Sequence, residues 1–286
     1  MIASPCVGSC RLDPATQLCG GCARSGAEIA AWKDADPAAR ARVWADLPRR
    51  RAALGIGLHR LDWTPGAALD FAASTLRGGL GAWEVGPPGA AVRLALGADV
   101  AWSVDRGAGT ITLDLHGATI RLVITERVRA LALAAPGGER IVLAVPRARP
   151  TPRPEPGLTP LGVDLDAIRP ADRGARLYDL GLGAGSGRAC LRTDDRALIA
   201  ALDRRAGQPG AAVLRDLAGG LAEAAPTLVV ANPLARAEVG AADLRNQLDL
   251  DLLALGREAP PGVDLPDGFL PCARFDPVPL FATVSD

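Results

Sequence analysis

The sequence predicts an α+β protein in which a small four-cysteine metal knuckle with two helices precedes a larger domain with an antiparallel sheet and packed helices. Four of the six cysteines fall within the first 22 residues, and helix caps follow directly after them. Between residues 82 and 145 the apolar pattern changes to a period of two, which is typical of strands. We expect one domain over 1–60 and a second over 65–286, with a Pro-rich connection at 146–160 inside the second.

The four N-terminal cysteines, Cys6, Cys10, Cys19 and Cys22, have the spacing C-x3-C-x8-C-x2-C. The surrounding segment has few large apolar side chains, so burial alone cannot keep it folded. Four thiolates on one metal would do so. Zinc accepts four thiolates in a closed structural site, and an iron–sulfur cluster also accepts four cysteines. We favour zinc, because the segment lacks the apolar cover that would shield a cluster, and we keep the cluster as the alternative.

Two short helices are expected after the cysteines. Ser25 and Glu28 have the spacing of a capping box that starts the first helix. Asp36 with Pro37 starts the second, which runs into Pro48-Arg49-Arg50-Arg51. The basic residues here make 1–60 net positive, but aromatic residues among them are few, so a solvated helix face is favoured over a nucleic-acid site.

The N-terminal segment contains a further set of motif positions: Ser4-Pro5-Cys6, Cys10, Leu12-Asp13-Pro14, Thr16, Cys19, Gly21-Cys22, Glu28-Ile29, Trp32 and Leu47-Pro48. At these positions it resembles the bacterial domain of unknown function 1289, whose pattern is S-P-C-x3-C-x-L-D-P-x-T-x-x-C-x-G-C, then E-I-x-x-W and L-P-x-R. The resemblance covers about a fifth of the chain and implies a four-cysteine iron–sulfur or other metal protein.

The larger domain begins with a helix after Thr64-Pro65 and continues with paired strands. Alternating apolar residues at 111–115 and 120–124 flank the turn His116-Gly117, and 128–134 and 140–145 repeat the arrangement. We expect an antiparallel meander here. After the Pro-rich connection we expect strands at 188–192 and 227–231, helices near 194–207 and 211–224, a last helix around Leu244 to Leu255, and an irregular tail over 260–286.

Residues 65–282 contain a second set of motifs: Trp83 to Gly86, Gly89-Ala90, Asp166 to Pro170, Asp172-Arg173, Asp179 to Gly183, Cys190 to Thr193, Leu253 to Arg257 and Leu270-Pro271-Cys272. Through these motifs the region resembles, more loosely, a bacterial family that we identify as domain of unknown function 6925. Several members of that family carry a histidine-rich stretch before the last helix, where this chain has Arg245-Asn246-Gln247.

The stretch Asp179-Leu180-Gly181-Leu182-Gly183-Ala184-Gly185-Ser186-Gly187 is similar to the first motif of class I methyltransferases, which bind S-adenosylmethionine. Thr227 to Pro233 is similar to their later strand that ends in Asn-Pro. However, the motif needs a helix directly after its glycines, and residues 188–192 have the pattern of a strand. We therefore favour a turn between strands over a nucleotide site.

The remaining polar residues indicate no catalytic group. Asp166, Arg169, Asp172 and Arg173 form a charged loop, for which a surface ion-pair network is favoured, and this loop with Arg192 is where we would expect any ligand pocket of the large domain. Cys190 and Cys272 are expected to be buried thiols.

The composition points to no particular partner. The formal net charge is zero, and no apolar run reaches the roughly 18 residues of a membrane span. The first residues have no basic start and no apolar stretch, so we expect a cytoplasmic protein with reduced cysteines. The function class favoured over an enzyme is an accessory or interaction protein with an unidentified protein partner. A nucleic-acid partner is disfavoured, and no membrane partner is expected. The alternatives are an iron–sulfur electron-transfer or sensing module and a methyltransferase.

Overall fold

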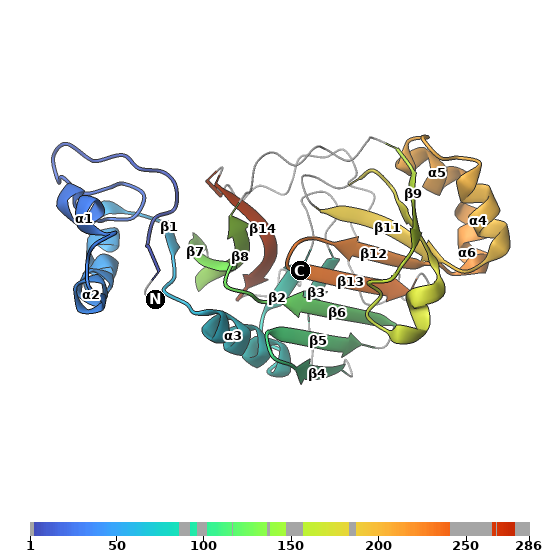
Figure 1. Cartoon of the computed structure of the whole chain (residues 1–286), viewed down its shortest axis with the longest axis horizontal. Helices are drawn as coiled ribbons and strands as arrows, with labels where there is room; N and C mark the ends of the chain where they lie inside the picture. The colour runs from blue at the N-terminus through green and yellow to red at the C-terminus, as the bar shows by residue number, and fades with distance from the viewer. Residues whose placement is uncertain are drawn as a thin grey trace, which may run out of the picture.

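The N-terminal module consists of a cysteine loop and two helices, at one end of the molecule (Figure 1). The computed structural model describes residues 3–85, 92–95, 102–115, 117–135, 138–146, 157–182, 187–240, 265–266 and 268–277. Helix α1 spans Gly26–Ala31 and starts at the capping box of Ser25 and Glu28. Helix α2 spans Pro37–Leu54, with the Asp36 side chain accepting a hydrogen bond from the Ala39 N–H. The two helix starts predicted from the caps are thus confirmed.

Helix α2 continues through Pro48 and ends at Gly55, which has the positive φ of 64° that favours glycine at a helix end. A proline inside a helix removes one backbone hydrogen bond. Here the basic residues after it hold the last turns in place by side-chain contacts. Arg50 pairs with Asp46 at 2.6 Å and with Glu28 of α1 at 2.7 Å.

A six-stranded antiparallel sheet follows the module in space. Its order is β1-β7-β8-β14-β2-β3, so the last strand of the described residues lies between two strands from much earlier in the chain. The strands are β1 (Leu58–Arg60), β7 (Arg129–Ala135), β8 (Gly138–Pro146), β14 (Phe269–Asp276), β2 (Ala82–Val85) and β3 (Val92–Ala95).

An eight-stranded antiparallel sheet completes the fold, in the order β4-β5-β6-β13-β12-β11-β10-β9. Strands from before and after the Pro-rich segment meet where β6 pairs with β13, Ile120 opposite Ala237. The strands are β4 (Trp102–Arg106), β5 (Thr110–Leu115), β6 (Ala118–Val123), β13 (Ala235–Gly240), β12 (Thr227–Ala231), β11 (Arg188–Thr193), β10 (Arg176–Asp179) and β9 (Thr159–Val163). The predicted hairpins are confirmed, but β5–β6 and β7–β8 belong to different sheets, so they do not form one continuous meander.

The main core lies between the facing sides of the two sheets, and helices close it at the side and at the far end (Figure 1). Helix α3 (Pro65–Arg77) contacts β4 and β5, and its Phe71 packs against Trp83 and Phe275 of the six-stranded sheet. Within the described residues, the helices after α3 are the short 3-10 helix η1 (Pro170–Gly174), α4 (Arg196–Asp203), α5 (Gly210–Asp216) and α6 (Ala218–Ala224). A small apolar cavity lies between α3, β2, β5 and β6, and none of its lining residues is charged.

A second, smaller apolar cluster joins the N-terminal module to the outer side of the six-stranded sheet. Val7, inside the cysteine loop, is buried against Leu131, Val142 and Phe269. This contact places the cysteine loop directly on the sheet.

Strands β1, β4, β9 and β13 were not expected from the sequence, and three expected features differ in the structure. The tail predicted to be irregular contains strand β14, which reaches Asp276. The helix predicted over 211–224 is two short helices that meet at Leu217. The end of the Pro-rich segment is packed, because Leu158 is buried and exchanges backbone hydrogen bonds with Gly207 and Gln208.

Some expectations lie outside the described residues. They concern residues 147–156, the turn residue His116, the last helix around Leu244 to Leu255, and Arg245-Asn246-Gln247. None of the helices in the described ranges is long and apolar enough to cross a membrane.

Candidate functional site

The cysteine loop is a compact hairpin whose turn is organised by one aspartate. Asp13 accepts hydrogen bonds from the Thr16 N–H at 2.7 Å and from the Thr16 hydroxyl at 2.9 Å. Isolated bridges pair Leu12 with Cys19 and Leu18 with Ser25. The turn therefore brings the chain after Cys10 alongside the chain that enters Cys19, which accounts for the L-D-P-x-T part of the motif.

The second cysteine pair forms a tight knuckle that rests on the first. Gly21 has no room for a side chain, because a Cβ atom there would lie 2.3 Å from the Ser9 carbonyl oxygen and 3.2 Å from Val7. The Cys19 sulfur also lies 3.7 Å from the Ser9 carbonyl oxygen. The loop between Cys6 and Cys10 and the knuckle between Cys19 and Cys22 are thus in direct contact.

Backbone and side-chain N–H groups face the sulfurs. The Gly8 N–H donates to Cys6 Sγ at 3.3 Å, and the Nε–H of Arg24 donates to Cys22 Sγ at 3.4 Å. Burial raises the pKa of Cys19, but the backbone N–H groups of Gly21 and Cys22 lower it more, so this pKa lies below the usual thiol value. Such N–H groups stabilise negative charge on sulfur, as metal-bound thiolates require.

The other three cysteines affect the pKa of Cys10. The pKa of Cys10 is raised, chiefly by the charge of Cys19, with smaller contributions from Cys6 and Cys22. As the side chains stand, no group of three or more His, Cys, Asp or Glu residues in the described part of the chain is arranged to hold a metal ion. The donor set and the cradle around Gly21 fit a tetrathiolate site. Closing it requires the sulfurs to converge, and rotation about a Cα–Cβ bond moves a sulfur between staggered positions.

The two helices brace the cysteine loop through motif residues. Glu28 closes the capping box on the Ser25 N–H at 2.8 Å and also binds Arg50 of α2. The Trp44 indole N–H donates to the Ala3 carbonyl at 2.9 Å. The E-I-x-x-W and L-P-x-R parts of the motif thus join α1 to α2 through Glu28 and Arg50, whereas Trp44, which lies outside the motif, ties α2 to the chain before Cys6. Of the three consecutive arginines, only Arg49 is largely exposed, so this run forms no continuous basic face.

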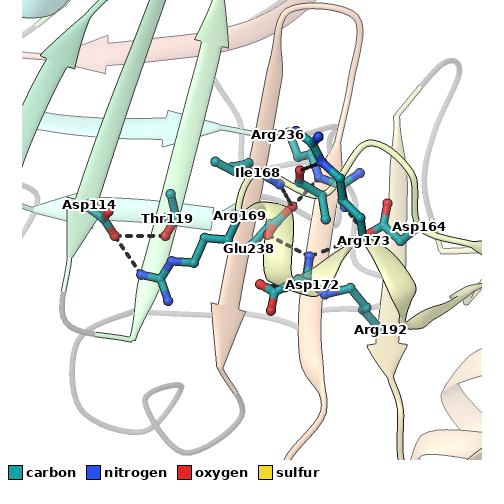
Figure 2. Close-up of polar contacts among 11 residues, drawn as sticks. Asp114, Thr119, Asp164, Ile168, Arg169, Asp172, Arg173, Arg192, Arg236 and Glu238 are labelled. Carbon is teal, nitrogen blue, oxygen red and sulfur yellow. Dashed lines mark hydrogen bonds and ion pairs between the residues drawn. The ribbon is translucent and has the colours of Figure 1, made fainter.

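The charged loop before β10 covers a buried ion network on the outer face of the eight-stranded sheet (Figure 2). Arg192 of β11 pairs with Glu238 of β13 at 2.7 Å and with Asp172 at 2.9 Å. Arg236 pairs with Glu238 and Asp164, and all of these residues except Asp172 are buried. The Ile168 N–H donates to Glu238 at 2.9 Å, so the loop backbone also belongs to the network.

The prediction for this loop was partly right. Arg169 forms an exposed ion pair with Asp114, which also accepts a hydrogen bond from Thr119, as a surface network would. Arg192, however, lies in the buried network together with Asp164, Arg236 and Glu238, which were not predicted from the sequence. The sequence signal that could have identified Arg236 and Glu238 was the alternation of apolar and charged residues in Ala235-Arg236-Ala237-Glu238-Val239. This alternation predicts a strand with one charged face. The charges of the buried network are matched to one another, which makes it a structural cluster that ties the loop to β11 and β13.

The glycine-rich stretch has strand geometry on both sides. Asp179, at the end of β10, accepts the Gly181 N–H at 2.9 Å, and β10 pairs antiparallel with β11. The described strands on both sides of this stretch are therefore antiparallel neighbours, whereas a methyltransferase motif needs a strand followed by a helix. Asn232 has a turn role, because its side-chain oxygen accepts the N–H groups of Leu234 and Ala235. Cys190 and Cys272 are buried, and burial raises the pKa of each thiol to about 12, as expected for unreactive thiols.

Comparisons with known proteins agree with these two parts of the chain. Residues 4–51 match the family model described as a protein of unknown function, DUF1289. Residues 70–283 match the model described as a family of unknown function, DUF6925. No curated protein and no solved structure matches the chain. Since the second match covers most of its length, the chain belongs to the DUF6925 family and carries a DUF1289-type cysteine module at its N-terminus.

Proposed function

We propose that this protein binds one metal ion through Cys6, Cys10, Cys19 and Cys22, and that the metal is a structural centre. The observation that carries the proposal is the knuckle between Cys19 and Cys22, which lies against the Cys6–Cys10 loop with N–H groups facing its sulfurs. A bound metal would hold the hairpin closed, since Val7 is the one buried aliphatic side chain between Cys6 and Cys22.

Zinc is the metal we favour. Cys10 is exposed and Cys6 is half-buried, whereas Cys19 and Cys22 are buried. A site open to solvent on one side suits a redox-inert ion better than a cluster that water and oxygen can attack. The alternative is an iron–sulfur cluster on the same four cysteines, which would make the module an electron-transfer or sensing unit.

The role we infer for the whole chain is that of an accessory or interaction protein in the cytoplasm. The cysteine module packs on the six-stranded sheet through Val7, so a metal there would set the shape of one end of the molecule. A methyltransferase function is disfavoured, because β10 and β11 pair directly as antiparallel strands. Equilibrium dialysis should accordingly find no micromolar binding of S-adenosylmethionine.

The test is metal analysis with a visible spectrum, on protein purified without oxygen. We expect about one equivalent of zinc and no colour, and a brown protein with iron and sulfide would select the cluster instead. The double variant Cys6→Ser with Cys22→Ser should lose the metal. The matched control is Cys190→Ala, which removes a buried thiol of β11 and should keep the full metal content. Metal-free wild-type protein would contradict the proposal.

A further inference from the structure

Three arginines are buried around the cysteine loop, although arginine side chains are rarely fully buried unless they are paired. Arg24, Arg51 and Arg60 are 3%, 7% and 9% exposed. Guanidinium groups stay charged at every physiological pH, so each of them brings a positive charge into the interior. A buried charge without a partner is strongly unfavourable, and an opposite charge nearby is expected.

Arg51, near the end of α2, forms no ion pair with a carboxylate of the described residues. Its Nε and one terminal nitrogen are buried and make no hydrogen bond. Its guanidinium lies 5.5 Å from the ring of Trp44, a contact that places the group but supplies no acceptor. Burial lowers the pKa of Arg51, and the charges that act against this are those of Cys22 and, more weakly, Glu139. The exposed carboxylate of Glu139 lies 3.9 Å from His59.

Arg24 contacts the Cys22 sulfur directly. Its Nε donates to Cys22 Sγ, and its guanidinium stacks 4.7 Å from the Trp32 ring. Arg60 has an unpartnered buried Nε, and Cys6 is among the charges that act on it. Four neutral thiols carry no negative charge that could balance these cations. Four thiolates on a divalent metal carry a net charge of −2, which is the missing opposite charge.

We propose that Arg51 and Arg24 are the counter-charges of an anionic metal–tetrathiolate centre, and that Arg51 holds that charge from helix α2. The inference rests on the proposed metal site and adds residues outside the ligand set. Arg51 is then a positioning residue, because it acts on the metal through the Cys22 sulfur. Removing an outer residue of this kind typically lowers metal affinity 10- to 100-fold.

This role gives Arg51 opposite effects in the two states of the protein. In the metal-free protein it is a buried cation without a carboxylate partner among the described residues, so Arg51→Met should raise the unfolding temperature. In the metal-bound protein it stabilises the negative centre, so Arg51→Met should weaken zinc binding. A side chain that only packs would shift both quantities in the same direction.

The experiment combines zinc competition against a chromophoric chelator with thermal unfolding of metal-free protein. We expect Arg51→Met to bind zinc 10- to 100-fold more weakly, and to unfold at a higher temperature than wild type once metal-free. Arg51→Lys, which keeps the charge without the planar fork, should fall between the two in affinity. Arg49→Met is the control, since it removes an exposed arginine of the same helix and should change neither quantity.

The outcomes separate the two proposals. If wild type binds zinc and Arg51→Met binds it equally tightly, the counter-charge role is wrong while the metal site stands. If Arg51→Met lowers both the affinity and the metal-free unfolding temperature, the residue only packs. If wild type binds no zinc, both proposals fail. Should Arg51→Met not fold, Arg51→Lys and Arg24→Lys give the same comparison, and unchanged affinity in both would overturn the inference.

Discussion

At the scale of single residues, Gly21 shows how the cysteine motif is built by close contact. This glycine lets the second cysteine pair lie against the backbone of Ser9. Gly20 beside it has more space, because a Cβ atom there would lie 3.6 Å from its nearest neighbour, the Arg11 carbonyl oxygen. The two adjacent glycines therefore differ in what they tolerate. Only Gly21 is required by the contact that brings the two cysteine pairs together.

We predict that Gly21→Ala destabilises the protein by about 1–3 kcal/mol, because the new methyl group overlaps the Ser9 carbonyl and forces the cysteine pairs apart. It should also reduce zinc retention. Denaturant unfolding and metal analysis measure the two effects, with Gly20→Ala as the matched control. Equal behaviour of the two variants would show that the contact with Ser9 has no such importance.

Glu238 is the residue on which the buried network depends, since it binds Arg192, Arg236 and the Ile168 N–H. Burial raises the pKa of Glu238, but hydrogen bonds from Arg236 and Arg192 lower it more, so its pKa in the folded protein is below the ordinary value. A depressed carboxyl pKa means that its stabilisation is complete above the unfolded-state pKa of about 4.3, and is lost as the pH falls through the folded-state pKa.

Glu238→Gln should accordingly cost about 3–5 kcal/mol at pH 7, because two buried arginines lose a charged partner. The difference from wild type should narrow as the pH falls below about 4. Unfolding free energies measured across this range test the prediction, with the exposed Glu126→Gln as the control. A difference that stays constant with pH would exclude a charge effect.

At the scale of elements, the turn at Asn232-Pro233 connects the neighbouring strands β12 and β13 and also makes a hydrogen bond to the other sheet. The Asn232 oxygen caps the β12–β13 turn, and its amide N–H₂ donates to the Cys272 carbonyl of β14 at 2.7 Å. One side chain thus holds a turn of the eight-stranded sheet against a strand of the six-stranded sheet. The Asn-Pro pair has this structural explanation without any nucleotide.

Asn232→Ala should destabilise the protein by about 1–3 kcal/mol, because buried backbone groups lose their partners. Asn232→Asp keeps the two acceptor bonds of the turn but cannot donate to Cys272. Its loss of stability in denaturant unfolding therefore reports the contact between the sheets. If Asn232→Asp were as stable as wild type, that contact would contribute nothing.

The elements that were predicted correctly are those with local signals. Capping residues start α1, α2 and α3, and alternation flanked by turn residues produces the β5–β6 and β7–β8 hairpins. Strand β14 was not predicted, because Pro271 argues against a strand. The structure accommodates this proline at an irregularity in the pairing with β8.

Pairing between distant segments could not be predicted at all. Strand β6 pairs with β13, and β14 inserts between β8 and β2. These pairings join strands more than 100 residues apart, and no local sequence pattern identifies the partner of such a strand. The same holds for the candidate sites. The cysteine spacing pointed to the four thiols. The buried arginines around them and the partners of Arg192 come from other elements and became visible only in three dimensions.

At the scale of the whole molecule, the cysteine module and the two sheets form a continuous structure. Val7 packs on β7, β8 and β14, strand β1 after α2 pairs with β7, and β14 lies in the same sheet as β2, which contributes to the main core. A metal in the cysteine loop would therefore stabilise the cysteine module, against which the six-stranded sheet packs. Binding that favours the folded state raises the stability of everything that unfolds with it.

The most direct test of the central proposal is X-ray absorption at the metal edge, on wild-type protein purified without oxygen. Zinc held by Cys6, Cys10, Cys19 and Cys22 predicts a zinc edge with about four sulfur neighbours at about 2.3 Å. The signal should disappear in the Cys6→Ser, Cys22→Ser double variant. The absence of any metal, or a metal surrounded by oxygen and nitrogen instead of sulfur, would contradict it.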